Sequence, residues 1–162
     1  MELDKTDAQI LDFMQEDARI SLADLAEKVA SSKSAVWRRI QKMEADGVIK
    51  KQTVLLDAAK VGLGVMVFAH VKMQAQNRDS LPEFIEKVSS FPEVIECHTL
   101  MGDIDFILKV VVKDVQAYED FFWKRLSHID GIREISSSIA LTAVKNTTSI
   151  PIGHHLNDLL GS

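Results

Sequence analysis

The first fifty residues repeat apolar side chains at the spacing of an α-helix, in three successive segments. These positions are Ile10, Leu11, Phe13 and Met14, then Leu22, Leu25, Ala26 and Val29, then Val36, Ile40 and Met43. Each set falls on one side of a helix that turns about 100° per residue. The pattern therefore predicts three amphipathic helices separated by very short breaks.

Capping residues mark where these helices begin and end. Ser21 is followed three residues later by Asp24, which resembles a capping box with Asp in place of the usual Glu. Ser31 and Ser32 are good N-caps for the third helix, and Gly47 is a natural stop after it. A helix, a short break and a second helix form the helix-turn-helix arrangement, whose second helix enters the major groove of DNA.

A change of pattern follows Gly47. Val48–Leu56 is short and rich in residues that favour strands, so we expect a strand there, as part of a wing. It carries Lys50 and Lys51, which would lie close to the phosphates. Asp57–Gly64 contains two glycines and no clear period, which predicts a hinge between two domains.

The remaining chain alternates between strand and helix periods. The expected strands are 65–73, 93–100, 104–112 and 132–144, and the expected helices are 79–90 and 115–126. Strand-helix-strand therefore occurs twice, which is the ferredoxin-like βαββαβ arrangement with both helices on one face of an antiparallel sheet. The fold class is α+β. The other sheet face needs a cover, and a second subunit is the commonest one, so we predict a dimer.

Composition narrows the class of protein. The chain has 162 residues, of which 46% are hydrophobic and 27% charged, as in globular proteins. No apolar run is long enough to span a membrane, and the N-terminus lacks a basic start and an apolar signal core. A single cysteine, Cys97, excludes an internal disulfide. Together these features predict a cytoplasmic protein.

Charge is distributed unevenly along the chain. The net charge of −5 alone argues against a protein that coats nucleic acid. Residues 1–27 hold two basic and eight acidic side chains, whereas residues 28–51 hold seven basic and two acidic ones. This swing predicts a face directed at a polyanion, although a solvated basic helix face is the equally plausible reading of charge alone.

The third helix places its polar side chains opposite the apolar stripe of Val36, Ile40 and Met43. Such side chains reach phosphates and base edges. The candidate DNA-binding residues are Ser32, Lys33, Ser34, Trp37, Arg38, Arg39, Gln41, Lys42, Lys50 and Lys51. Trp37 has two readings of equal weight, one over the DNA and one as a partly buried packing residue.

The chain resembles the Lrp/AsnC transcriptional regulators along nearly its whole length. The matching N-terminal residues are Leu3-Asp4, Asp7, Ile10-Leu11, Arg19, Ser21, Leu25-Ala26, Val29, Ser32, Arg39, Glu44, Gly47 and Ile49. Residues 94–109 resemble the family's strand-turn-strand with its Gly-Asp-x-Asp turn. Two departures stand out. Ala30-Ser31-Ser32-Lys33 replaces the usual Gly-Leu-Ser-Pro, and Met101 stands where a hydroxyl residue is usual.

The resemblance implies a sequence-specific, DNA-binding regulator whose assembly or DNA affinity responds to an amino acid. Residues 1–56 would bind double-stranded DNA, 57–64 would be the hinge, 65–145 the effector-sensing and oligomerisation domain, and 146–162 a tail of unassigned role. Family members form dimers that commonly assemble into octamers and bind the effector between dimers. Carried onto this chain, the effector-binding residues would be Met101, Gly102, Asp103, Ile104, Asp105, Ser138, Ile139, Ala140 and Thr142. Without the resemblance, the turn would read as a plain one whose acids face water.

Enzyme readings are weaker. Cys97 and His98 are neighbours on a strand and point to opposite faces, so Cys97 reads as a buried apolar group. His154-His155 would need further ligands to hold a metal, and no nucleotide-binding or zinc-protease motif occurs. We therefore expect no enzyme, cofactor or metal. The alternatives are a ligand-binding oligomeric module without DNA binding and, less favoured, a metabolic enzyme.

Overall fold

A computed structural model describes residues 3–74 and 81–152 of the chain. The chain divides into two compact units, one formed by residues 1–54 with the tail from Lys145 onward, and the other by Leu55–Val144. Among the described residues, no helix is long and apolar enough to cross a membrane.

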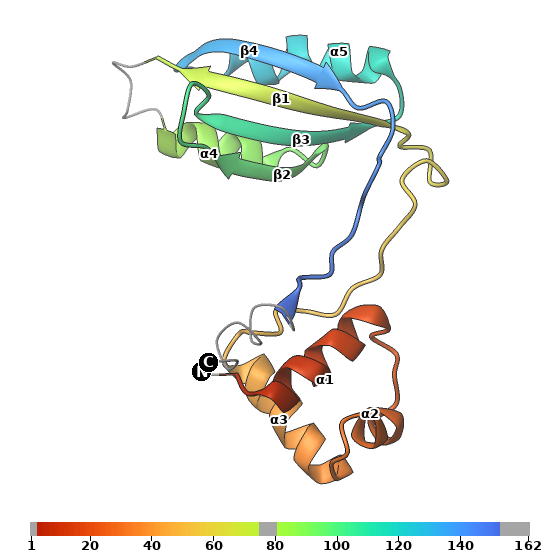
Figure 1. Cartoon of the computed structure of the whole chain (residues 1–162). Coiled ribbons are helices and arrows are strands. Elements are labelled where there is room, and N and C mark those ends of the chain that lie inside the picture. Colours follow the sequence, from red (N-terminus) through yellow and green to blue (C-terminus); the bar gives the residue numbers. More distant parts are fainter. Residues whose placement is uncertain (1–2, 75–80, 153–162) are drawn as a thin grey trace. The chain divides into compact units, whose positions relative to one another are not determined.

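The N-terminal unit contains the three predicted helices, α1 (Lys5–Glu16), α2 (Leu22–Lys28) and α3 (Lys33–Ala45) (Figure 1). Ser21 caps α2 by accepting a hydrogen bond from the Asp24 amide, and Ser32 caps α3 by accepting one from the Ala35 amide. The predicted apolar positions form its core, which consists of Ile10, Leu11, Leu25, Ala26, Val29, Val36 and Met43. Burial of this shared stripe holds the three short helices together, because none is long enough to be stable alone.

The turn between α2 and α3 is strained at Ala30. Its φ angle is +49°, in the left-handed region that favours glycine. The Ala30 amide donates to the Glu27 carbonyl and the Ser31 amide donates to the Ala26 carbonyl, which is the Schellman pattern at a helix C-terminus. The position where the family usually has glycine therefore keeps glycine's conformation in this chain, although it holds alanine.

We expect Ala30→Gly to stabilise the N-terminal unit by about 0.5–1 kcal/mol, because relief of the left-handed strain outweighs the extra entropy of glycine. Urea denaturation followed by Trp37 fluorescence, in a Trp123→Phe background, measures this effect, since the chain has two tryptophans. Gly47→Ala should act in the opposite direction, because Gly47 has a φ of +73°. An unchanged or lowered midpoint for Ala30→Gly would refute the assignment of strain.

The strand predicted at Val48–Leu56 is wrong. Residues 50–57 are extended without ladder pairing, and Val54, Leu55 and Leu56 are exposed. A strand requires a neighbouring backbone to accept its hydrogen bonds, and the described residues supply none to this segment. Strand propensity alone is therefore not sufficient here.

The second unit contains a four-stranded antiparallel sheet in the order β2-β3-β1-β4. Its strands are β1 (Val65–Met73), β2 (Val94–Thr99), β3 (Phe106–Val112) and β4 (Ile132–Ile139), and its helices are α4 (Leu81–Ser90), α5 (Val115–Lys124) and the 3-10 turn η2 (Leu126–His128). The fold is the predicted ferredoxin-like one, in which α4 and α5 lie on the same face of the sheet (Figure 1). Because β4 ends at Ile139, the prediction that this strand continues to Val144 is wrong.

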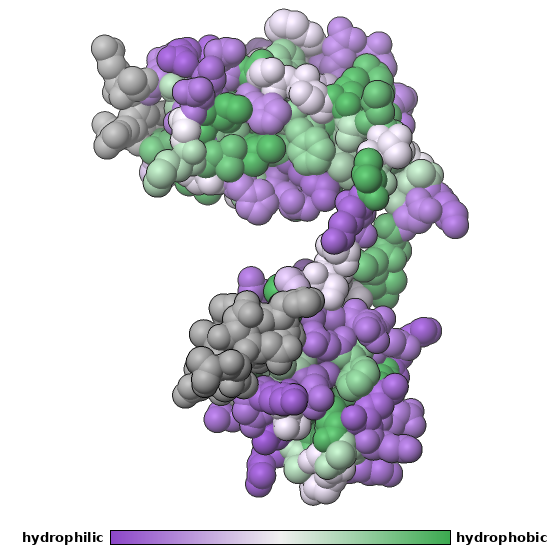
Figure 2. All heavy atoms as spheres, viewed as in Figure 1, coloured by the Kyte–Doolittle hydropathy of each residue, from purple (hydrophilic) through white to green (hydrophobic). Residues whose placement is uncertain are grey.

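The packed side of the sheet alternates strictly with the open side. Val67, Ala69 and Val71 of β1 are fully buried against Phe84 of α4 and Phe121 of α5 in one core. The intervening residues of β1, such as Phe68, His70 and Lys72, therefore point to the side without helices. Apolar and polar side chains are interspersed over this open face (Figure 2).

Candidate DNA-binding surface and ligand pocket

Most of the predicted DNA-binding side chains share the exposed face of α3. Val36 and Met43 are fully buried on the opposite side of this helix. The exposed candidates are Ser32, Lys33, Ser34, Trp37, Arg38, Gln41 and Lys42. Of these, Lys33, Arg38 and Lys42 have no ion-pair partner among the described residues, so their charges remain available to a polyanion.

Trp37 is 56% exposed. This exposure favours the interpretation in which the indole ring is free to contact DNA over the one in which it is a partly buried packing residue. Gln41 donates a hydrogen bond to Glu44 at 2.8 Å, and Ser32 is used as the cap of α3. Lys50 and Lys51 are also exposed, but they lie on the extended segment after α3 and not on a strand.

Arg39 lies differently from its neighbour Arg38. Its guanidinium donates to a carboxylate oxygen of Asp4 and to one of Asp7, each at 2.7 Å. Asp7 is only 3% exposed and is the one charged residue in the described core. Arg39 therefore joins α3 to the start of α1, a structural task that sequence spacing alone did not reveal.

The same contacts shift two pKa values. Burial works to raise the pKa of Asp4, but the Asp7 amide and the Arg39 guanidinium stabilise the carboxylate, and the net shift is below its ordinary value. Hydrogen bonds to Asp7 and then to Asp4 raise the pKa of Arg39. Asp4 also caps α1 in a reciprocal capping box with Asp7. This cluster thus fixes one end of the helical unit.

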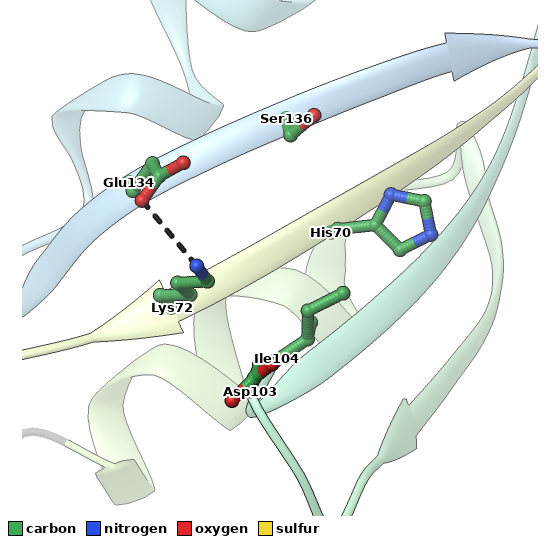
Figure 3. Close-up of a pocket in the computed structure, with 6 residues that line it drawn as sticks. All are labelled: His70, Lys72, Asp103, Ile104, Glu134 and Ser136. Carbon is green, nitrogen blue, oxygen red and sulfur yellow. Dashed lines mark ion pairs between the residues drawn. The ribbon is translucent and has the colours of Figure 1, made fainter.

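A pocket lies on the open face of the sheet. Its cavity of about 260 Å³ is lined by His70, Lys72, Asp103, Ile104, Glu134 and Ser136. Lys72 on β1 faces Glu134 on β4 with 3.7 Å between their charged atoms, while Asp103 and Ile104 approach from the loop before β3 (Figure 3). One cation, two carboxylates and one apolar side chain therefore converge on a small cavity.

The predicted effector residues take several different positions relative to this pocket. Asp103 and Ile104 line it. Ser138 pairs with Phe68 and is exposed on the open face, whereas Ile139 pairs with Val67 and so lies on the helix side. Met101, Gly102 and Thr142 are exposed in loops, and Ala140 follows the end of β4.

Asp105 forms hydrogen bonds with the backbone of β1. Its carboxylate accepts a hydrogen bond from the Met73 amide at 2.7 Å, and its own amide donates to the Val71 carbonyl at 3.0 Å. It does not line the pocket. We therefore assign it to holding the turn against β1 in place of the ligand contact expected from sequence.

Four pocket residues escaped the sequence analysis. His70, Lys72, Glu134 and Ser136 come from two strands that are distant in the sequence and adjacent in the sheet, paired as His70 with Ser136 and Lys72 with Glu134. The sequence did hold one signal for two of them. His70 and Lys72 are polar and alternate along β1 with the apolar, buried residues Val67, Ala69 and Val71. The partner strand could not be known without the register.

Of the residues weighed for enzyme chemistry, those that the structure describes form no metal-binding cluster. Cys97 is exposed on β2, which is an edge strand of the sheet, so the prediction that it is buried is wrong. Among the described residues, no three His, Cys, Asp or Glu side chains gather as metal ligands. His154-His155 lies outside the described residues.

Two family profiles match the chain. A winged helix-turn-helix DNA-binding profile covers residues 3–50, and a profile of the Lrp/AsnC ligand-binding domain covers residues 66–150. The chain is 39% identical over 150 residues to the glutamate uptake regulatory protein of Zymomonas mobilis, with 93% of this chain and 91% of that protein aligned. It is 33% identical over 150 residues to the DNA-binding transcriptional activator DecR of Escherichia coli, with 93% and 99% aligned.

Solved structures are similar across both units. An AsnC family transcriptional regulator from Agrobacterium tumefaciens shares 43% identity and gives a TM-score of 0.88, with 94% of this chain and 99% of that chain covered. A transcriptional regulator from Neisseria meningitidis, solved in complex with L-methionine, shares 34% identity and gives a TM-score of 0.90, with 95% and 99% covered. The similarity therefore includes the sheet face that carries the pocket.

Proposed function

The chain belongs to the Lrp/AsnC family of DNA-binding transcriptional regulators, and from this premise we propose that a free amino acid bound on the open sheet face alters how α3 binds DNA. The observation that carries the proposal is the pairing of two surfaces in one chain. One is the cationic outer face of α3, and the other is a small pocket with charges of both signs.

The DNA-binding half of the proposal rests on α3. Arg38 and Lys42 lie one helical turn apart, and Lys33 is in the first turn. Arginine contacts guanine edges and phosphates with its two-pronged guanidinium, while lysine neutralises phosphates. We propose that the N-terminal half of α3 enters the major groove and that Lys50 and Lys51 contact the flanking backbone.

The pocket suits a zwitterion. An amino acid presents a carboxylate, for which Lys72 is the cation of the pocket, and an ammonium group, for which Asp103 and Glu134 are the carboxylates; binding would replace the 3.7 Å contact between Lys72 and Glu134. Ile104 supplies the apolar wall for a side chain. The cavity of about 260 Å³ has room for an amino acid but not for a large cofactor. The complex of the Neisseria meningitidis regulator with L-methionine supports this ligand class.

We further propose that a second copy covers the open face, giving a dimer that assembles toward an octamer in the cytoplasm. Phe68 and Ile107 lie half-buried there without helices above them. A pocket beside such an interface lets ligand binding favour one assembly over another. The ligand changes DNA affinity only by the difference between its affinities for the two states. That the chain catalyses no reaction stays a prediction.

We expect one or more of the twenty amino acids to raise the melting temperature progressively with concentration. Lys72→Met should then weaken binding of that amino acid by about tenfold to a hundredfold, because a hydrogen bond to a charged group is lost. Isothermal titration calorimetry measures the change, with Lys113→Met as the control, because Lys113 is exposed and does not line the pocket. Equal affinities for Lys72→Met and wild type, or no thermal shift with any amino acid, would refute the pocket assignment.

A further inference from the structure

The C-terminal tail contacts the N-terminal helical unit, to which its described residues belong. The side-chain amide of Gln15, in the last turn of α1, forms two hydrogen bonds with the backbone of Ile150. Its nitrogen donates to the Ile150 carbonyl at 3.1 Å, and its oxygen accepts from the Ile150 amide at 2.7 Å. One side chain therefore satisfies both polar backbone groups of a single residue, as a neighbouring strand would.

A second contact is apolar. Ile152 packs against the core cluster of the helical unit, beside the buried side chains of α1, α2 and α3. The Ile150 side chain, in contrast, is 67% exposed. The tail is thus held at Ile150 through its backbone and at Ile152 through its side chain.

Local hydrogen bonds within the tail fix the shape of the docked segment. The Ser149 amide donates to the Thr147 hydroxyl at 3.1 Å, and the Ile152 amide donates to the Ile150 carbonyl at 2.8 Å. Pro151 restricts the backbone of Ile150 to extended conformations, which presents its amide and carbonyl to Gln15. Less conformational entropy is then lost when the segment binds.

We infer that α1 carries a docking site for the chain's own C-terminal segment, Thr147–Ile152, recognised through the Ile150 backbone by Gln15. The inference does not depend on the proposed function. Since the sheet unit is entered from Val54 and left at Lys145, docking gives it two connections to the helical unit, where a helix-turn-helix domain needs only one.

Because few residues separate β4 from the docked segment, two hydrogen bonds and one apolar contact are sufficient to hold that segment on the helical unit. β4 ends at Ile139 and the chain reaches Gln15 at Ile150. A segment tethered this closely is present at an effective concentration on the order of millimolar, so weak contacts hold it.

Amide hydrogen exchange at position 150 in the full-length protein tests the docking without ligand or DNA. We expect Gln15→Ala to accelerate exchange about fivefold to tenfold, the loss that corresponds to a hydrogen bond. Glu16→Ala, on the exposed side of the same turn, should leave exchange unchanged. Ile150→Ala should also keep the protection, because Gln15 contacts only the backbone. Unaltered exchange in Gln15→Ala, or equal acceleration in Ile150→Ala, would overturn the inference.

A cross-link identifies which chain supplies the segment. Glu16→Cys and Ser149→Cys, combined in a Cys97→Ser background, are joined with a short bismaleimide. We expect an internally linked single chain on a denaturing gel. A linked pair of chains, or no linked product, would overturn the docking of the chain's own tail.

Discussion

Replacing Arg39 by alanine is expected to lower the free energy of unfolding of the helical unit by about 2–4 kcal/mol. Removal of one partner of a buried ion pair leaves the other charge uncompensated, and here the orphan is Asp7, which is 3% exposed. The expected loss is below the largest reported for such pairs because the Arg39 side chain is itself 35% exposed. A small helical unit has little stability in reserve, so the loss approaches complete unfolding.

Urea denaturation followed by Trp37 fluorescence measures the loss. A Trp123→Phe background removes the tryptophan of α5, so the signal comes from the helical unit alone. Asp7→Ala combined with Arg39→Ala should cost less than the sum of the two single changes, because the double variant leaves no buried charge. Additive losses, or a midpoint unchanged by Arg39→Ala, would contradict the assignment of Arg39 to the fold.

Arg38→Ala is expected to affect DNA binding and to leave the stability of the helical unit almost unchanged. It should weaken DNA binding by about tenfold to a hundredfold at fixed salt, because a contact to a base edge or phosphate contributes about 1–3 kcal/mol. Its effect on unfolding should stay within about 0.5 kcal/mol, since an exposed side chain without an ion-pair partner among the described residues is removed. Adjacent arginines would thus separate binding from stability.

Fluorescence anisotropy with a labelled promoter fragment measures the DNA affinity of this variant. Arg19→Ala is the matched control, because Arg19 is an exposed arginine of the same unit and lies outside α3. Size-exclusion chromatography should show the oligomer intact in both variants. If Arg38→Ala dissociates the oligomer, or binds DNA as tightly as Arg19→Ala does, the outer face of α3 is not the DNA-binding surface.

The sequence was sufficient where local physics decides the outcome. Helical periodicity and caps placed the three N-terminal helices, because Ser21, Ser32 and Gly47 act within one turn of their own position. Strand alternation placed the ferredoxin-like sheet in the same way. Helix patterns and caps depend on neighbours three or four residues apart and strand patterns on neighbours two residues apart, and a sequence records such neighbours directly.

The sequence was insufficient where distant segments meet. Arg38 and Arg39 are alike by type and position, and only contact with Asp4 and Asp7, more than thirty residues earlier, separates them. The pocket residues of β1 and β4 meet through sheet register. The sequence did not predict the docking of the tail, because Gln15 binds the backbone amide and carbonyl of Ile150. Backbone groups are common to all sequences and therefore leave no signal in the residue pattern. The strand predicted at Val48–Leu56 did not form because it has no partner within the described chain.

The measurement that tests the central claim most directly is the salt dependence of binding to DNA from upstream of the protein's own gene. Each of two subunits supplies five cationic contacts, from Lys33, Arg38 and Lys42 of α3 and from Lys50 and Lys51 after it. The association constant should therefore fall about a hundred-thousandfold between about 50 and 200 mM salt, linearly on logarithmic axes. Absence of binding at about 50 mM salt, or binding that salt does not weaken, would contradict the assignment of this chain's α3 to DNA.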